Sequence, residues 1–326
     1  MIKEYIKSSK SFTNLISDNE KDKMPHAVML ISNDRVYSKH YATELSKSLL
    51  CENKHNGVAC GECNICKNIE KGVHPDIISF GLEETITSED AKRIIESTII
   101  GPYSAERKVY ILYNYDDVNK TVENKLLKTL EEPPSYCIFI LVVKNVARLL
   151  QTTLSRTRKI YLEGLSTEVL SKLLKEQNVE DAELVAVQSC GSLERAEVYS
   201  KNNDAKEIMT FVCNCLMNMN DTTSILEYAL KFESYSLQFE DVINTFAMVV
   251  FDALKFKIGV EALVDNKIYK REISKIADST TVTALTKIIE ATYKAKEMKE
   301  SNVIIPNIVD QFLLKIVEVK LKCRKR

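Results

Sequence analysis

The sequence predicts an α/β domain followed by a small helical domain and a larger helical domain. Three observations support this order. The chain has 326 residues and a mass of 37.1 kDa, which is more than one ordinary hydrophobic core holds, so we expect two or three domains. Short apolar runs alternate with helical patterns as far as residue 162. After Gly164 the strand pattern disappears and helical patterns continue to the end.

Five short runs of apolar or β-branched residues predict the strands of the first half, namely Ala27–Ile31, Ile77–Phe80, Val109–Tyr113, Cys137–Val143 and Lys159–Leu162. Helical patterns separate them, at Ser38–Leu50, Ser88–Ile99, Asn119–Leu130 and Ala147–Leu154. Thr87 and Asp90 have the spacing of a capping box at the start of the second helix. Nearly continuous apolar strands separated by helices are typical of a parallel sheet covered on both faces. We therefore expect one α/β domain over residues 1–163.

The second half divides into two helical parts. Residues 164–203 show a few short helical patterns with a break at Gly191 and Ser192, which predicts a small helical domain. Residues 204–326 read as helical throughout. Two apolar stripes recur there at a helical period, Val242, Ile243, Phe246, Ala247, Val250, Phe251 and Leu254, and then Ile304, Ile308, Phe312 and Ile316. These stripes predict a helical bundle.

Composition and charge exclude two broad classes of protein. The chain carries 45 basic and 46 acidic side chains, so no overall basic field attracts nucleic acid, and any such contact must be local or made through partners. No apolar run approaches the roughly 18 residues that cross a bilayer, and the N-terminus, MIKEYIKSSK, is charged within its first turn. We expect a cytoplasmic protein.

Four of the nine cysteines fall within sixteen residues, with the spacing C-x8-C-x2-C-x2-C: Cys51, Cys60, Cys63 and Cys66. Two cysteines three apart can hold one metal from a tight turn, and Gly61 favours such a turn. Four thiolates complete a tetrahedral Zn²⁺ shell without an open position, so we expect a structural zinc site. Free thiols and an iron–sulfur cluster are the alternatives, and a colourless protein would exclude the cluster.

The run NKLLKTLEEPP, at Asn124–Pro134, precedes the apolar strand CIFILVV. Glu131 and Glu132 are adjacent on a helix and point about 100° apart, so they cannot act as a catalytic pair on one atom. Together with TLSRT at Thr153–Thr157, the four-cysteine insertion, the strand start at His26 and GSLERA at Gly191–Ala196, this run resembles the bacterial clamp-loader branch of the AAA+ family. The resemblance implies an AAA+ core, a helical lid and a helical collar over residues 1–163, 164–203 and 204–326.

An ATP-hydrolysing member of that family carries a glycine-rich loop ending in GK[ST] directly after the first strand, because glycines let backbone N–H groups reach the phosphates. Residues 31–39 contain no glycine. The loop glycines correspond to Ser32, Arg35 and Tyr37, and the phosphate-binding lysine corresponds to Ser38. We expect Tyr37 to fill the space of the phosphates and Asp34 to repel them.

The other ATP-binding elements are altered as well. Where the third strand should end in a magnesium-binding carboxylate and a catalytic glutamate, the sequence has Tyr113 and Asn114. Asp116 and Asp117 lie two or three residues beyond the positions that the two carboxylates should occupy. The polar sensor position on the fourth strand holds Val143. We therefore expect that this chain neither binds nor hydrolyses ATP.

Leu154–Thr157 matches the SRC motif of the family, with Thr157 in place of the cysteine. The resemblance implies that Ser155 and Arg156 form an arginine finger that reaches the γ-phosphate of ATP on a neighbouring subunit, a task that suits a permanently charged, forked guanidinium. The alternative is that Arg156 and Arg158 are a solvated surface pair. Arg195 stands at the second-sensor position, where we expect it to brace a domain interface.

The resemblance implies a ring member without ATPase activity of its own, assembled with tau/gamma and delta subunits and acting on a sliding clamp at primed DNA. One alternative is an ATP-binding tau/gamma-type subunit, which the missing glycines oppose. Another is a stand-alone zinc-dependent DNA-binding protein, which is opposed because Lys54 is the one Lys or Arg between Cys51 and Cys66. The basic tail Lys320–Arg326 is expected to be a solvated terminus, with DNA contact as its alternative.

Overall fold

The computed structural model describes residues 1–201, 204–219, 221–235, 238–261, 264 and 266–324. The chain forms two compact units. The first contains residues 1–164 together with 192–194, and the second contains 165–191 together with the residues from 195 onward. An α/β core followed by an all-α region confirms the predicted fold class. The finer division of the helical region into a lid and a collar stays a prediction.

The first unit is built on a five-stranded parallel sheet of β1 (Ala27–Ile31), β2 (Ile77–Phe80), β3 (Lys108–Leu112), β4 (Cys137–Val143) and β5 (Arg158–Tyr161). The strand order is β2-β3-β4-β1-β5, and every neighbouring pair is parallel. In the centre of the sheet, Met29 lies opposite both Leu141 and Lys159. All five strands start and end within one residue of the prediction.

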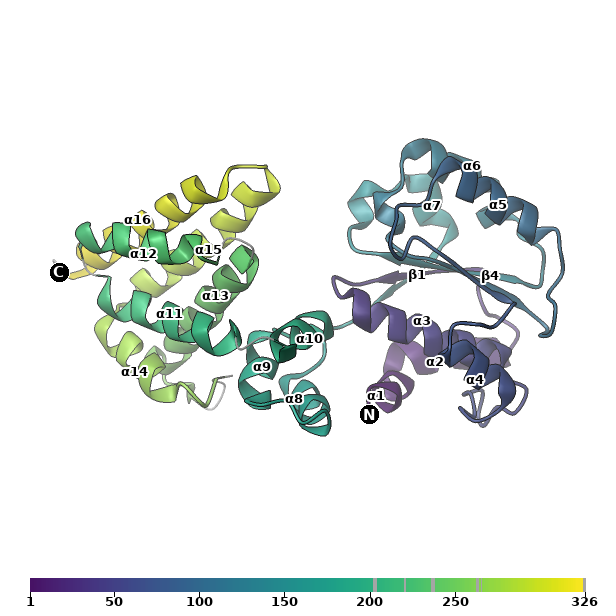
Figure 1. Ribbon diagram of the computed structural model, residues 1–326, viewed down its shortest axis with the longest axis horizontal. Coiled ribbons are helices and arrows are strands. Elements are labelled where there is room, and N and C mark those ends of the chain that lie inside the picture. The colour runs from purple at the N-terminus through teal and green to yellow at the C-terminus, as the bar shows by residue number, and fades with distance from the viewer. Residues whose placement is uncertain (202–203, 220, 236–237, 262–263, 265, 325–326) are drawn as a thin grey trace. The chain divides into compact units, whose positions relative to one another are not determined.

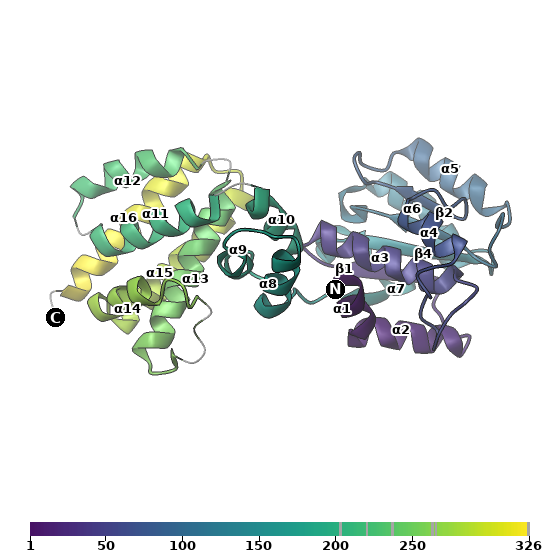
Figure 2. The ribbon, with the colours of Figure 1, turned by 60° about the horizontal axis from the view of Figure 1, so that its bottom comes forward.

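Helices cover both faces of this sheet, as the composition of the strands predicts (Figures 1 and 2). One face carries α5 (Ser88–Thr98), α6 (Lys120–Glu131) and α7 (Gln151–Arg156). The other carries α1 (Ile2–Ser8), α2 (Lys10–Glu20), α3 (Arg35–Leu50) and α4 (Asn64–Glu70). The pattern did not predict α1, α2 or α4. Helices α1 and α4 have only seven residues and depend on packing, whereas α2 has eleven, and the spacing of Phe12, Leu15 and Ile16 could have indicated it.

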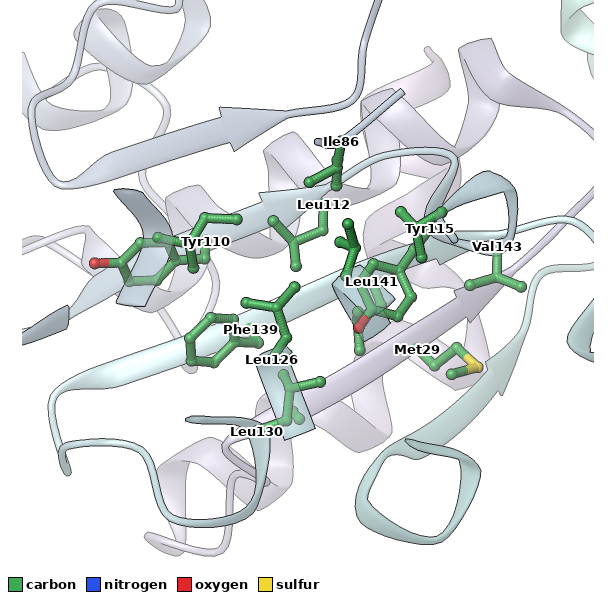
Figure 3. Close-up of a cluster of buried hydrophobic side chains, with 14 of the residues drawn as sticks. Met29, Ile86, Tyr110, Leu112, Tyr115, Leu126, Leu130, Phe139, Leu141 and Val143 are labelled. Carbon is green, nitrogen blue, oxygen red and sulfur yellow. The ribbon is translucent and has the colours of Figure 1, made fainter. Parts of the chain in front are cut away.

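The core beneath α5 and α6 is formed by alternate residues of the strands (Figure 3). Tyr110 and Phe139 stack with their ring centroids 4.9 Å apart, and Leu126 and Leu130 of α6 pack into the same cluster. Burying each such side chain contributes about 1.5–3 kcal/mol to folding. The alternation follows from the two-residue period of a strand, so this face of the sheet could be predicted.

The helix predicted at Ala147–Leu154 is interrupted. Ala147–Leu154 forms a short 3₁₀ segment, η2 (Val146–Arg148), and then α7, which begins only after Leu150. The cause is the buried carboxylate of Glu123, which accepts hydrogen bonds from the Leu150 backbone N–H and the Thr153 hydroxyl, both at 2.7 Å. Leu150 is thereby held in an extended conformation that a continuous helix would not allow.

The second unit is helical in all its described elements: α8 (Thr167–Glu176), α9 (Ala182–Gln188), α10 (Leu193–Lys201), α11 (Asp204–Asn218), α12 (Thr223–Glu233), α13 (Phe239–Lys257), α14 (Lys270–Ser279), α15 (Val282–Glu300) and α16 (Ile305–Arg324). Phe246 of α13 and Phe312 of α16 meet edge to face, 5.0 Å between centroids. Both predicted stripes are largely buried, but Phe251 and Ile304 are exposed. In the described parts of the chain, none of the helices combines the length and apolar character that a bilayer crossing requires.

Candidate functional site

The four cysteines of the insertion lie together between α3 and α4. Their sulfur atoms all lie within 4.8 Å of one another, with Cys51 3.6 Å from Cys60 and 3.9 Å from Cys63. A tetrahedral metal with bonds of about 2.3 Å to sulfur requires sulfur atoms about 3.8 Å apart. The group can therefore hold a metal ion.

The backbone around the cysteines favours thiolate ligands. Cys63 is the N-cap of α4, where its sulfur accepts the Cys66 N–H at 3.4 Å, and Cys60 accepts the Cys63 N–H at 3.4 Å. Backbone N–H groups of Glu62 and Cys63 lower the pKa of the Cys60 thiol to about 6. Burial acts in the opposite direction on Cys66 and raises its pKa. Gly61 has φ of +81°, the turn conformation that glycine adopts without strain.

Residues 32–39 follow β1, at the edge where the carboxyl ends of the strands meet and where open α/β sheets bind ligands. Ser32 donates its backbone N–H to Val143 O at 3.0 Å, and the buried Ser38 hydroxyl donates to Asp34 O at 2.7 Å. The ring of Tyr37 is buried, with its centroid 6.5 Å from that of Tyr5 in α1. Arg35 is exposed at the start of α3. Helix α3 thus begins at Arg35, three residues before the predicted start.

Asp34 explains this early start. Its Oδ1 accepts the Tyr37 N–H at 2.8 Å, so Asp34 is the N-cap of α3. Its Oδ2 accepts hydrogen bonds from a second helix start, namely from the Ser192 hydroxyl at 3.1 Å and from the backbone N–H groups of Leu193 and Glu194. Sequence reasoning treated Asp34 only as a repulsive charge, although an Asp before a helix is a recognised N-cap signal.

The aspartates after β3 have structural partners. Asp116 is buried and accepts the backbone N–H groups of Lys144 and Asn145, at 3.2 and 2.8 Å. Asp117 pairs with Arg148 at 2.8 Å. Asn114 has φ of +49° and donates its side-chain amide to Gly81 O at 2.7 Å. Both carboxylates therefore serve to join the loops after β3 and β4.

Arg156 is the last residue of α7, and its side chain contacts α6 and its own helix in the first unit. Nη2 is 2.9 Å from Glu131 Oε1 at the end of α6, and Nη1 donates to Thr152 O at 2.9 Å. Ser155 Oγ donates to the same carbonyl at 3.0 Å. Nε is buried and, among the described residues, has no hydrogen-bond acceptor. Sequence reasoning missed Glu131 as a partner, since it considered that residue only as a catalytic acid.

The remaining basic candidates also have partners. Arg158 pairs with Asp18 of α2, so the two arginines do not form a common solvated pair. Arg195 Nε lies 3.7 Å from Asp241 Oδ1 of α13, and both residues belong to the second unit. Lys320 is buried and donates to Leu216 O and Met219 O, which corrects the expectation of a wholly solvated tail. Residues 325 and 326 of that tail lie outside the described residues.

Comparison with known proteins identifies the relatives of the chain. A family model described as "DNA polymerase III, delta subunit" matches residues 7–166. DNA polymerase III subunit delta′ of Bacillus subtilis is 26% identical over 93% of this chain and 94% of that protein. DNA polymerase III subunit gamma of Buchnera aphidicola is 35% identical over 46% of this chain, but the match covers only 42% of that protein. A solved gamma subunit-related protein of Thermotoga maritima covers 94% of this chain at 18% identity, with a TM-score of 0.44.

The family model and the delta′ relative confirm the resemblance carried by LLKTLEEPP and the four-cysteine insertion. The matched region contains the whole parallel sheet, the cysteine group and Arg156. Residues 7–166 therefore match the DNA polymerase III delta subunit family, and nearly the whole chain is similar to a DNA polymerase III delta′ subunit.

Proposed function

We propose that this chain is a delta-prime-like subunit of the clamp loader, which joins the ring without binding or hydrolysing ATP. One observation carries the proposal: the start of α3, where a phosphate-binding loop would lie, has no glycine and holds the Asp34 carboxylate over its first turn. A negative charge at that place opposes a triphosphate. Titration of the isolated chain with ATP and Mg²⁺ by calorimetry should give no binding, and micromolar affinity would favour a tau/gamma-type subunit instead.

In this proposal Arg156 acts in trans on ATP that a tau/gamma neighbour binds. Its position at the end of α7 and its partly exposed side chain support that role, because a guanidinium that solvent reaches can also meet an anion from another chain. Arg156 must first exchange Glu131 for the phosphate, and an ion pair with partly exposed groups costs little to open.

The Arg156→Ala variant should fold and assemble, but hydrolysis at the facing ATP site should slow by about a thousandfold or more. The measurement is single-turnover ATP hydrolysis by the complex with tau/gamma, delta, clamp and primed DNA. Arg158→Ala is the matched control, because it removes a neighbouring guanidinium that pairs with Asp18. Equal rates for both variants and the wild type would exclude the finger.

We further propose that the four cysteines hold a structural Zn²⁺. The sulfur separations of 3.6 and 3.9 Å support this metal, because they match a four-thiolate zinc shell. Such a shell has no open position, so the ion would stabilise the loop between α3 and α4 and take no part in chemistry. Elemental analysis should give about one zinc per chain.

A further inference from the structure

The start of α3 and the first residues of α10 lie next to each other in the first unit, and each helix start is capped by a carboxylate from the other. Helix α3 begins at Arg35, and α10 begins at Leu193, whose first residues belong to the same compact unit as the sheet. Asp34, at the start of α3, accepts the N–H groups of Leu193 and Glu194. In return, Glu194 Oε2 accepts the Arg35 N–H at 3.1 Å.

The local chemistry favours an anion at this place. The first N–H groups of a helix have no partner within it, and the helix dipole adds positive charge there. Two such ends facing each other make a site that a phosphate could occupy. Asp34 is 7% exposed, and its two oxygens accept from Tyr37, Ser192, Leu193 and Glu194.

We propose that Asp34 and Glu194 form an internal anion that replaces nucleotide phosphate between the N-termini of α3 and α10. The two carboxylates satisfy the helix starts and hold residues 192–194 on the first unit without any bound nucleotide. This inference rests on the proposed absence of ATP binding, and it assigns a positioning role to Glu194 and, beyond its negative charge, to Asp34.

The test is hydrogen exchange of the full chain, measured by mass spectrometry. In Asp34→Ala, peptides covering residues 35–38 and 192–196 should exchange about tenfold faster at the amides of Tyr37, Leu193 and Glu194, which lose a charged acceptor. Adding ATP to the wild type should leave the exchange of these peptides unchanged. Sodium formate, compared with sodium chloride at equal ionic strength, should partly restore protection in Asp34→Ala by supplying a free carboxylate.

Asp90→Ala is the matched control, because Asp90 belongs to the capping box of α5. It should accelerate exchange at the start of α5 and leave residues 192–196 unchanged. Glu194→Ala provides a second variant at a half-buried position, and it should accelerate exchange at Arg35 even if Asp34→Ala does not fold.

Unchanged exchange of residues 192–196 in Asp34→Ala, or of Arg35 in Glu194→Ala, would overturn the inference. Slower exchange of these segments in the wild type on adding ATP would overturn it as well. ATP binding seen by calorimetry, with exchange in the variants as expected, would instead reject the proposed function and keep the two capping roles.

Discussion

Single carboxylates hold several loops of the first unit in place, and Asp76 shows how. Asp76 follows the buried His74 and is itself buried before β2. Its oxygens accept the backbone N–H groups of Tyr103, Ser104 and Ala105 and the Ser104 hydroxyl. Burial alone would raise the pKa of Asp76, but these donors outweigh it and lower the pKa below the ordinary value. The charged form therefore fixes the loop between α5 and β3.

Asp76→Asn should destabilise the folded chain by about 2–3 kcal/mol at pH 7, because an amide cannot accept from all these donors. Since the pKa of Asp76 is lower in the folded state, its contribution is present above about pH 4 and is lost as the pH falls below that value. The free energy of unfolding, measured with urea at pH 7 and pH 3, should show a smaller difference between variant and wild type at pH 3. Asp22→Asn, at an exposed side chain, is the control. A difference independent of pH would contradict this account.

How far a residue's role could be predicted depends on how distant its partners are in the sequence. The capping box of Thr87 and Asp90 spans three residues, and the structure confirms it. The partners of Asp34 lie 158 to 160 positions away, at Ser192, Leu193 and Glu194, so no local pattern could indicate them. The same holds for Glu131 and Arg156, 25 positions apart.

At the scale of elements, strands were predictable and short helices were not. The strands are apolar because both of their faces are covered, which leaves a clear signal in sequence. Helices α4 and α7 have seven and six residues, and their ends depend on the caps made by Cys63 and on the carboxylate of Glu123. The cysteine loop, which connects α3 and α4, also depends on contacts with another helix. A Cβ atom at Gly57 of this loop would lie 2.5 Å from the Ile16 side chain of α2, so the loop packs closely against α2 at that point.

If the cysteine loop holds zinc, Cys63→Ser should lower both the zinc content and the melting temperature of the first unit. The serine oxygen is a poor fourth ligand for zinc, whereas serine is a favourable N-cap, so the variant keeps the cap of α4 and loses only the metal. Adding a chelator should lower the melting temperature of the wild type and leave the variant nearly unchanged. Cys190→Ser, at an exposed position in the second unit, is the control. A wild type that is insensitive to chelation would contradict a structural metal.

At the scale of the whole molecule, the second unit carries apolar side chains that its own core does not bury. Helix α12 buries Tyr228, Ala229 and Phe232, yet Leu226 and Leu230 of the same helix are 70% and 61% exposed. They stand one helical turn apart and so share a face. This exposed pair supports the proposed assembly through the helical region, as a surface for a neighbouring subunit.

The double substitution Leu226→Lys with Leu230→Lys should leave the isolated chain folded but prevent it from joining tau/gamma and delta. Two charges in an interface core would remain without partners, while on the free surface they are solvated. Circular dichroism checks the fold, and size-exclusion chromatography of the mixed subunits checks assembly. Ile258→Lys, at another exposed apolar position, is the control. Normal assembly of the double variant would assign the interface to a different face.

The paired caps of α3 and α10 have a consequence for regulation. A ligand that belongs to the polypeptide cannot diffuse away, so its effective concentration does not fall on dilution or with the metabolic state of the cell. A free anion that competes for this place must displace a carboxylate that is part of the chain itself. In a ring whose other members respond to the energy supply, such a subunit would remain the same at every stage of the cycle, and the timing of the cycle would have to come from its neighbours.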